Sequence, residues 1–219
     1  MIKNIIFDFD GVLVDSEILV AKAFSKYLLK KNINLSEKEF SIFAGKKTVQ
    51  VIKELSQKFN IKKEEEFFDD IMKISHDIYD NELTPVVGAG NFLKNANLNY
   101  FIGSNSVKER IISGLKKVNF EIFFSEEKIY SFDMVNQPKP YPDIYLAALE
   151  RNNLNKHETI IIEDSVVGVQ AGVNAGVKVI GLTAGGHWHS ERSTEELIEA
   201  GASLLIHDYS TLLNDIKKL

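Results

Sequence analysis

The sequence predicts an α/β protein with a doubly wound parallel sheet and an inserted helical domain. From about residue 85 onward, short apolar runs alternate with segments of helical periodicity, as in a sheet covered by helices on both faces. Between residues 16 and 84 the periodicity is helical only. Polar clusters follow three apolar runs, at the strand ends where such sheets bind ligands. We therefore expect a core of residues 1–15 and 85–219 and a helical domain of residues 16–84.

The first predicted strand ends in two carboxylates. Ile5, Ile6 and Phe7 form an apolar, partly β-branched run that is typical of a buried strand. Asp8 and Asp10 follow it, and they begin on one face because side chains of a strand alternate with a period of two. Two like charges there repel each other and are costly to desolvate. A divalent cation such as Mg²⁺ would relieve both problems, and the alternative is an acidic turn at the strand end.

Four segments of the region 16–84 have apolar residues at helical spacing. They are Val20, Phe24, Tyr27 and Leu28; Phe40, Ile42 and Phe43; Val51, Ile52, Leu55 and Phe59; and Phe67, Ile71, Ile74 and Ile78. Ser36 and Glu39 form a capping-box pattern before the second segment. The lysine and glutamate run at 62–66 is interpreted as the solvated start of a helix. Turn residues at 84–90 mark the return to the core.

Strands and helices alternate beyond residue 90. The expected strands are 100–102, 159–162, 178–182 and 203–206, the expected helices are 106–115, 142–149, 166–175 and those after 193 and 206, and the short segments 122–124 and 129–132 stay unassigned. Two further capping boxes, Ser106 with Glu109 and Ser193 with Glu196, are predicted to begin helices.

Length and composition exclude several classes of function. The 219 residues carry a net charge of −5 and no basic stripe, so nucleic acid is not an expected partner. The absence of cysteine excludes disulfides and thiolate metal sites and fits a cytoplasmic protein. No apolar run approaches about 18 residues, so we expect neither a signal peptide nor a membrane span. The expected state is a monomer or a weak homo-oligomer.

Polar residues also follow two other predicted strands. Ser104 and Asn105 come after the strand at 100–102, and Glu163 and Asp164 after the strand at 159–162. Ser104 could donate to a phosphoryl oxygen beside the next helix N-terminus, or it could simply cap that helix. Asp164 could also be a helix cap, but two adjacent acids after three isoleucines favour a metal site.

The cationic candidate is Lys139, which lies among three of the four prolines of the chain. Proline fixes φ and removes backbone donors, so this segment is predicted to be a stiff loop that holds the ammonium in place. A positioned cation is what phosphoryl transfer requires. His187, Trp188 and His189 are assigned to a surface loop, because no third ligand accompanies the two histidines.

Four motifs together resemble those of the haloacid dehalogenase-like superfamily, in its phosphatase and phosphomutase branch. In order they are Asp8-Phe9-Asp10-Gly11-Val12-Leu13-Val14-Asp15-Ser16-Glu17, Gly103-Ser104-Asn105-Ser106, Lys139-Pro140-Tyr141-Pro142-Asp143 and Glu163-Asp164-Ser165-Val166-Val167-Gly168. The resemblance covers nearly the whole chain. It implies a Rossmann-like core and makes residues 16–84 a cap domain over the active site, attached by hinges near residues 15 and 84.

The resemblance also implies how the reaction proceeds. Asp8 would attack phosphorus and become an aspartyl phosphate, and Asp10 would act as general acid and then general base. Mg²⁺ would be held by the Asp8 carboxylate, the Asp10 backbone carbonyl and Asp164, with Glu163 binding it directly or through water. Ser104 and Lys139 would balance charge on the phosphoryl oxygens. The backbone N–H groups of residues 9–11, including Phe9 and Gly11, would face the phosphoryl oxygens, and Asn105 would also contact the substrate. Apart from the resemblance, Lys46 and Lys47 on the loop after Gly45 could bind the substrate from the cap, or they could be ordinary solvated lysines at a helix start.

Three functional readings compete. The first is a phosphatase of small phosphorylated metabolites such as sugar phosphates. Within this group the chain most resembles bacterial 6-phosphogluconate phosphatases, and the residues that carry this resemblance are Asp15-Ser16-Glu17-Ile18, Glu82-Leu83 and Gly88-Ala89-Gly90. The second is a phosphomutase like β-phosphoglucomutase, but the histidine and the cap arginine of that group are replaced here by Ile18-Leu19-Val20 and Lys46-Lys47. The third is a non-enzymatic phospho-aspartate switch, against which Asp10 and Lys139 argue. Dehalogenase activity is disfavoured, because an acidic residue at position 10 is a mark of the phosphoryl-transfer branch of the superfamily that the chain resembles.

Overall fold

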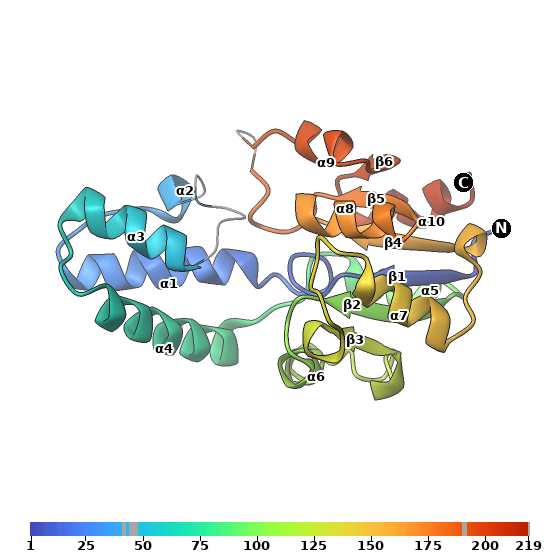
Figure 1. Ribbon diagram of the computed structural model, residues 1–219, viewed down its shortest axis with the longest axis horizontal. Coiled ribbons are helices and arrows are strands. Elements are labelled where there is room, and N and C mark those ends of the chain that lie inside the picture. The colour runs from blue at the N-terminus through green and yellow to red at the C-terminus, as the bar shows by residue number, and fades with distance from the viewer. Residues whose placement is uncertain (41–42, 44–47, 190–191, 219) are drawn as a thin grey trace. The chain divides into compact units, whose positions relative to one another are not determined.

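The computed structural model describes residues 1–40, 43, 48–189 and 192–218, and it divides into two compact units. Met1–Asp15 and Thr84–Leu219 form one unit, which we name the core unit. Ser16–Leu83 form the other, which we name the helical unit. Each unit has its own buried apolar cluster (Figure 1).

The core unit contains a six-stranded parallel sheet in the order β3-β2-β1-β4-β5-β6. The strands are β1 (Asn4–Phe7), β2 (Asn99–Ser104), β3 (Ile129–Ser131), β4 (Thr159–Glu163), β5 (Lys178–Leu182) and β6 (Leu204–Ile206). From β1 the chain first adds β2 and β3 on one side and then β4, β5 and β6 on the other side, which is the doubly wound arrangement. The predicted fold class is therefore confirmed, and the three-residue strand β3 resolves the unassigned segment 129–132.

Helices cover both faces of this sheet (Figure 1). They are α5 (Ala89–Asn95), α6 (Lys108–Lys117), α7 (Asp143–Arg151), α8 (Val166–Asn174), α9 (Glu195–Glu199) and α10 (Tyr209–Ile216). Ile6 and Ile161 point to the face where α7, α8 and α9 pack. Phe7 points the other way and meets the rings of Phe92 in α5 and Tyr100 in β2. This alternation buries β1 and β4 completely, because a strand in the middle of a parallel sheet has apolar neighbours on both sides.

The registers of the central strands bring their ends to the same level. Phe7 lies opposite Ile162 of β4 and Ile102 of β2. The Asp8 backbone N–H still donates to the Ile162 carbonyl at 2.9 Å, so Asp8 leaves the sheet beside Glu163. Residues 155 positions apart in the sequence are thereby placed together by strand pairing alone.

Two predicted capping boxes are wrong, although their helices are present. Helix α6 is preceded by Val107, without a side-chain cap, because the Ser106 hydroxyl is engaged elsewhere. Helix α9 is preceded by Thr194, which makes no side-chain cap. The Ser193 hydroxyl accepts from the Glu195 N–H at 3.3 Å instead of the Glu196 N–H, and the Glu196 carboxylate accepts from Arg192 at 2.7 Å. In α6 the hydroxyl that the capping box requires is bound to Asp10, and in α9 the carboxylate that it requires is bound to Arg192.

The helical unit consists of helices packed around aromatic side chains. They are α1 (Glu17–Lys30), α2 (Glu37–Phe40), α3 (Thr48–Phe59) and α4 (Glu64–Glu82). Tyr27 stacks on Phe67 at 4.2 Å between ring centroids, and Phe24 stacks on Phe40 at 4.7 Å. The predicted Ser36–Glu39 capping box is confirmed, since the Glu39 N–H donates to Ser36 Oγ and the Ser36 N–H donates to the Glu39 carboxylate.

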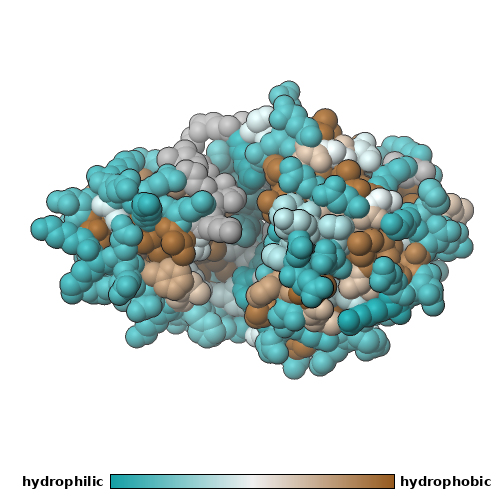
Figure 2. All heavy atoms as spheres, in the orientation of Figure 1, coloured by the Kyte–Doolittle hydropathy of each residue, from teal (hydrophilic) through white to brown (hydrophobic). Residues whose placement is uncertain are grey.

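Hydrophilic side chains dominate the face of the helical unit that Figure 2 shows, interrupted by small apolar patches. Helix α4, the longest helix described at 19 residues, is charged along much of its length. In the part of the chain that the structure describes, no helix combines the length and the apolar character needed to cross a bilayer.

Candidate active site

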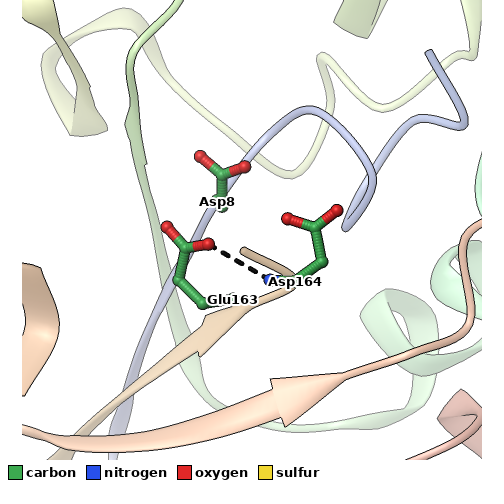
Figure 3. A group of neighbouring side chains, drawn as sticks. All are labelled: Asp8, Glu163 and Asp164. Atoms are coloured by element: carbon green, nitrogen blue, oxygen red, sulfur yellow. Dashed lines mark hydrogen bonds between the residues drawn. The ribbon is translucent and has the colours of Figure 1, made fainter. Parts of the chain in front are cut away.

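Three carboxylates converge at the carboxyl ends of β1 and β4. Ligand atoms of Asp8, Glu163 and Asp164 all lie within 4.8 Å of one another, and all three residues are buried (Figure 3). Asp8 follows β1, Glu163 ends β4, and Asp164 is the next residue. Among the described residues this is the group of acids placed to hold a metal ion, and oxygen ligands of this kind suit Mg²⁺.

Lys139 lies within this acidic group. Its Nζ atom is 2.7 Å from Asp8 Oδ1 and 2.5 Å from Glu163 Oε1, and the residue is only 6% exposed. The ammonium also lies 4.8 Å from the ring centroid of Tyr145. Three carboxylates therefore face one ammonium, and two negative charges are left for another cation. A divalent metal ion would fit this charge and this set of donors.

Asn105 holds the loop that carries Lys139. Its Oδ1 atom accepts from the Lys139 backbone N–H at 2.9 Å, and its Nδ2 donates to the Lys139 carbonyl at 3.3 Å. Both ends of the amide are thus used to fix the loop. The substrate contact predicted for Asn105 stays a prediction, and the geometry assigns this side chain a positioning role for Lys139.

The Glu163 carboxylate is surrounded by donors from the protein. Oε1 accepts from Lys139 and, at 2.6 Å, from the Tyr145 hydroxyl. Oε2 accepts from the Asp164 N–H at 3.1 Å, drawn in Figure 3, and from the Ser165 hydroxyl at 3.1 Å. A methyl group on Gly168 would lie 1.9 Å from this carboxylate, so only glycine fits there. Glu163 therefore supports Lys139, and the metal contact predicted for it stays a prediction.

Burial shifts the acid–base properties of the group. Desolvation raises the pKa of Asp8 well above its usual value, Lys139 opposes this, and repulsion from Glu163 and Asp164 adds to it. Desolvation also raises the pKa of Asp164, followed by repulsion from Glu163. For Lys139, burial alone would lower the pKa, but Asp8 and Glu163 together raise it above the ordinary value. These shifts mark an excess of buried negative charge that a bound cation would offset.

Asp10 does not join the three-carboxylate group and is held by another set of contacts. Arg110 Nη1 lies 2.7 Å from Asp10 Oδ1 and 2.8 Å from Oδ2. The Ser106 hydroxyl donates to Oδ2 at 2.6 Å. Neither Arg110 nor a role for Ser106 beyond helix capping follows from the sequence pattern, because the loop after β1 and the start of helix α6 meet only in the folded chain.

The loop after β1 forms a tight turn at Gly11. The Gly11 N–H donates to the Val14 carbonyl at 2.8 Å, and its contact with the phosphoryl oxygens stays a prediction. Gly11 has a φ of +75°, and a Cβ atom there would lie 1.9 Å from Asp164 Oδ2. Glycine is needed because the backbone turns beside a predicted metal ligand. Phe9 is fully buried, so any substrate contact of this residue would have to come from its backbone.

Ser104 is almost fully buried at the end of β2, where its Oγ accepts from the Ser106 N–H at 3.0 Å. The hydroxyl proton is not used in that contact and could serve an anion. Lys46 and Lys47, predicted to bind substrate from the cap, lie outside the residues that the structure describes.

The assignment of His187 and Trp188 to an ordinary surface loop is wrong. His187 Nε2 lies 3.1 Å from Asp164 Oδ2, and its side chain is 10% exposed. Trp188 packs against the apolar cluster of the core unit, and the Arg192 guanidinium lies 3.7 Å from its ring centroid. The loop after β5 reaches the site because β5 is the neighbour of β4 in the sheet. The sequence spacing of the two histidines carries no information about this neighbourhood.

Comparisons with known proteins show which family and which proteins the chain is similar to. The sequence profile of the haloacid dehalogenase-like hydrolase family matches residues 5–182. The chain is 27% identical to a 6-phosphogluconate phosphatase of Escherichia coli over 85% of each protein, and 27% identical to a phosphorylated carbohydrates phosphatase of Thermotoga maritima over 99% of each. A conserved haloacid dehalogenase-like protein of unknown function from Agrobacterium tumefaciens superimposes with a TM-score of 0.90 at 28% identity, over 100% of this chain and 99% of the other.

Proposed function

Because the chain belongs to the haloacid dehalogenase-like hydrolase family, we propose that it is a Mg²⁺-dependent phosphatase of small phosphorylated metabolites. The prediction of a phosphoric monoester hydrolase is confirmed by that family and by relatives named as phosphatases. The metal dependence, the intermediate and the substrate are our proposal. The observation that carries it is the convergence of Asp8, Asp164 and Lys139 at one end of the sheet.

Asp8 is the proposed nucleophile. Its carboxylate attacks phosphorus, the ester P–O bond breaks, and an aspartyl phosphate forms. Lys139 lies 2.7 Å from Asp8 Oδ1, where it can compensate the charge of the entering phosphoryl group without moving. The Ser104 hydroxyl is the further donor expected for a phosphoryl oxygen.

Asp10 is the proposed general acid and base. It gives a proton to the leaving oxygen in the first step. In the second step a water molecule attacks phosphorus, Asp10 takes the proton of that water, and the bond to Asp8 breaks to release inorganic phosphate. One residue can serve both steps because the first leaves it in the form that the second requires.

Asp8 and Asp164 are the side chains proposed to hold Mg²⁺, with the Asp10 carbonyl as a further ligand. A bound Mg²⁺ would neutralise charge on the phosphoryl group and orient it. Their donor set, two buried Asp carboxylates with excess negative charge, fits this ion. Since Glu163 is already bound by Lys139, Tyr145 and Ser165, it contributes to the metal site through its charge.

Sugar phosphates are the proposed substrate class, and 6-phosphogluconate is the compound that we would test first. Support comes from the two relatives named after phosphorylated carbohydrates, one of which aligns over 99% of both chains. The helical unit is proposed to act as a cap whose closure excludes water and selects the substrate. We further expect a cytoplasmic protein that works as a monomer or a weak homo-oligomer.

The deciding experiment measures phosphate release from a panel of phosphorylated metabolites with the purified protein, in Mg²⁺ and in EDTA. We expect Mg²⁺-dependent release from sugar phosphates and none in EDTA. Full activity in EDTA would refute the metal site. Conversion of β-glucose 1-phosphate into glucose 6-phosphate without phosphate release would put the phosphomutase in first place.

A further inference from the structure

We propose that Arg110, together with Ser106, is the positioning group that fixes the Asp10 carboxylate for proton transfer. This inference rests on the proposed acid–base role of Asp10. It assigns a function to a residue of helix α6 that belongs to none of the four motifs identified in the sequence.

The geometry fixes the carboxylate in orientation as well as in position. A single guanidinium nitrogen, Arg110 Nη1, bridges both oxygens of Asp10 at 2.7 and 2.8 Å. Ser106 donates to Oδ2 at 2.6 Å and accepts from the same Arg110 nitrogen at 2.5 Å. The three side chains form a closed triangle of short contacts, so rotation of the carboxylate would break more than one of them.

The backbone beneath Asp10 is fixed independently. The Gly11 N–H donates to the Val14 carbonyl, and the Val14 N–H donates to the Phe9 carbonyl at 3.1 Å. The adjoining Phe9 side chain is fully buried. The remaining freedom of Asp10 lies in its own side-chain torsions, and these are what Arg110 and Ser106 restrict.

Arg110 occupies a position that helix stability does not favour. It is the third residue of α6, and a cation in the first turn of a helix is opposed by the helix dipole. The side chains of Arg110 and Asp10 are 36% and 16% exposed, so solvent screens part of the attraction between them and reduces its contribution to stability. A role in the folded site explains the residue better than a role in stability. Ser106 lies four residues earlier, which places it on the same side of the helix start.

Positioning should matter most where the proton transfer is demanding. An alkyl phosphate expels an alkoxide, a poor leaving group that needs the Asp10 proton as the P–O bond breaks. The p-nitrophenolate ion leaves without that proton. Loss of Arg110 should therefore damage the first reaction far more than the second, whereas general damage to the site would slow both equally.

The experiment compares kcat/KM for 6-phosphogluconate, or the alkyl phosphate best hydrolysed in the panel above, with kcat/KM for p-nitrophenyl phosphate. These values report the step that expels the leaving group. For Arg110→Ala we expect a loss of about 10–100-fold with the alkyl ester and of less than about threefold with the aryl ester. Arg110→Lys should lie between wild type and Arg110→Ala, because an ammonium is a point charge that cannot reproduce the guanidinium geometry. Lys116→Ala, which removes an exposed cation from the same helix, is the matched control and should change neither value.

The outcomes separate this inference from the proposed function. Equal losses with both esters, or no loss, in a folded Arg110→Ala protein would overturn the positioning role. Asp10→Asn is measured alongside: if it hydrolyses the alkyl ester normally, the acid–base role of Asp10 fails and the proposed function with it. If Asp10→Asn is inactive on the alkyl ester while Arg110→Ala equals wild type, only the present inference is refuted.

Discussion

Replacing Asp164 with asparagine should stabilise the metal-free protein, which is unusual for a change in a buried site. Asparagine has nearly the same shape and removes one negative charge from a group in which three carboxylates face a single ammonium. Two charges within 4.8 Å repel by about 3.5 kcal/mol at an effective dielectric constant of about 20. Lost attraction to Lys139 and a weakened contact with His187 offset part of this gain. We therefore expect the free energy of unfolding in EDTA to rise by about 1–3 kcal/mol.

The same variant should respond little to Mg²⁺. An ion that binds only the folded protein stabilises it by about 2.7 kcal/mol at a concentration 100 times its dissociation constant. Wild type should gain this amount, and Asp164→Asn should gain much less because it lacks a ligand. Urea unfolding followed by fluorescence suits the measurement, since the single tryptophan, Trp188, packs in the core unit next to His187. Asp133→Asn is the control: the Ser131 side chain holds the pKa of Asp133 below its usual value, so its neutralisation should not stabilise the protein.

The pH dependence gives the sign of the effect. The pKa values of Asp8 and Asp164 are raised in the folded protein, so protonation of these two residues stabilises the folded state. This contribution to the free energy of unfolding is largest below the unfolded-state pKa near 3.8. It is lost as the pH rises through the folded-state pKa values. The advantage of Asp164→Asn should therefore be largest at neutral pH and should vanish in acid. If this variant is less stable than wild type in EDTA at neutral pH, or if Mg²⁺ stabilises both proteins equally, the electrostatic account and the metal assignment are wrong.

Four further predictions concern single contacts. Asp8→Asn should remove turnover and leave the circular dichroism spectrum unchanged, and measurable phosphate release would contradict the covalent mechanism. Glu163→Gln should destabilise the protein by about 1–3 kcal/mol, since it weakens the charge-assisted hydrogen bonds from Lys139 and Tyr145 while Asp8 still pairs with Lys139; a free energy of unfolding like that of wild type would refute this. Gly168→Ala should cost about 1–3 kcal/mol and reduce activity, because its methyl group would meet the Glu163 carboxylate; unchanged kinetics would contradict the close approach. Joint replacement of Lys46 and Lys47 by alanine should raise KM more than it lowers kcat, and an unchanged KM would argue against cap contacts with the substrate.

Strand-end chemistry could be predicted from the sequence because it depends on local pattern. The run of isoleucines before Glu163 predicts a buried strand, and the acids that follow it must lie at the sheet edge. Pairing of parallel strands then brings Asp8, Asp164 and Ser104 to that same edge. The stiffness of the proline-rich loop, which is also a local property, predicts that Lys139 is a positioned cation.

Contacts between elements could not be predicted in the same way. Ser106 has the sequence pattern of a helix cap, but Asp10, 96 residues away, takes its hydroxyl. Arg110 has the appearance of a surface helix residue until the fold brings the loop after β1, with Asp10, to the start of α6. His187 reaches Asp164 because its loop follows β5, which lies next to β4 in the sheet. The order of the strands in the sheet cannot be predicted from the spacing of the histidines.

The two adjacent acids at the end of β4 show how one strand can supply two separate functions. Because side chains alternate along a strand, Glu163 and Asp164 leave β4 in different directions. Glu163 turns toward Lys139 and Tyr145 and is enclosed by protein donors. Asp164 turns toward Gly11, whose missing side chain makes the approach possible. The longer acid thus fixes Lys139, the cation proposed to compensate the phosphoryl charge, and the shorter one is the proposed metal ligand. Exchange of the two residue types would break both arrangements, because glutamate at position 164 would collide with the Gly11 turn and aspartate at position 163 would fall short of the Lys139 ammonium.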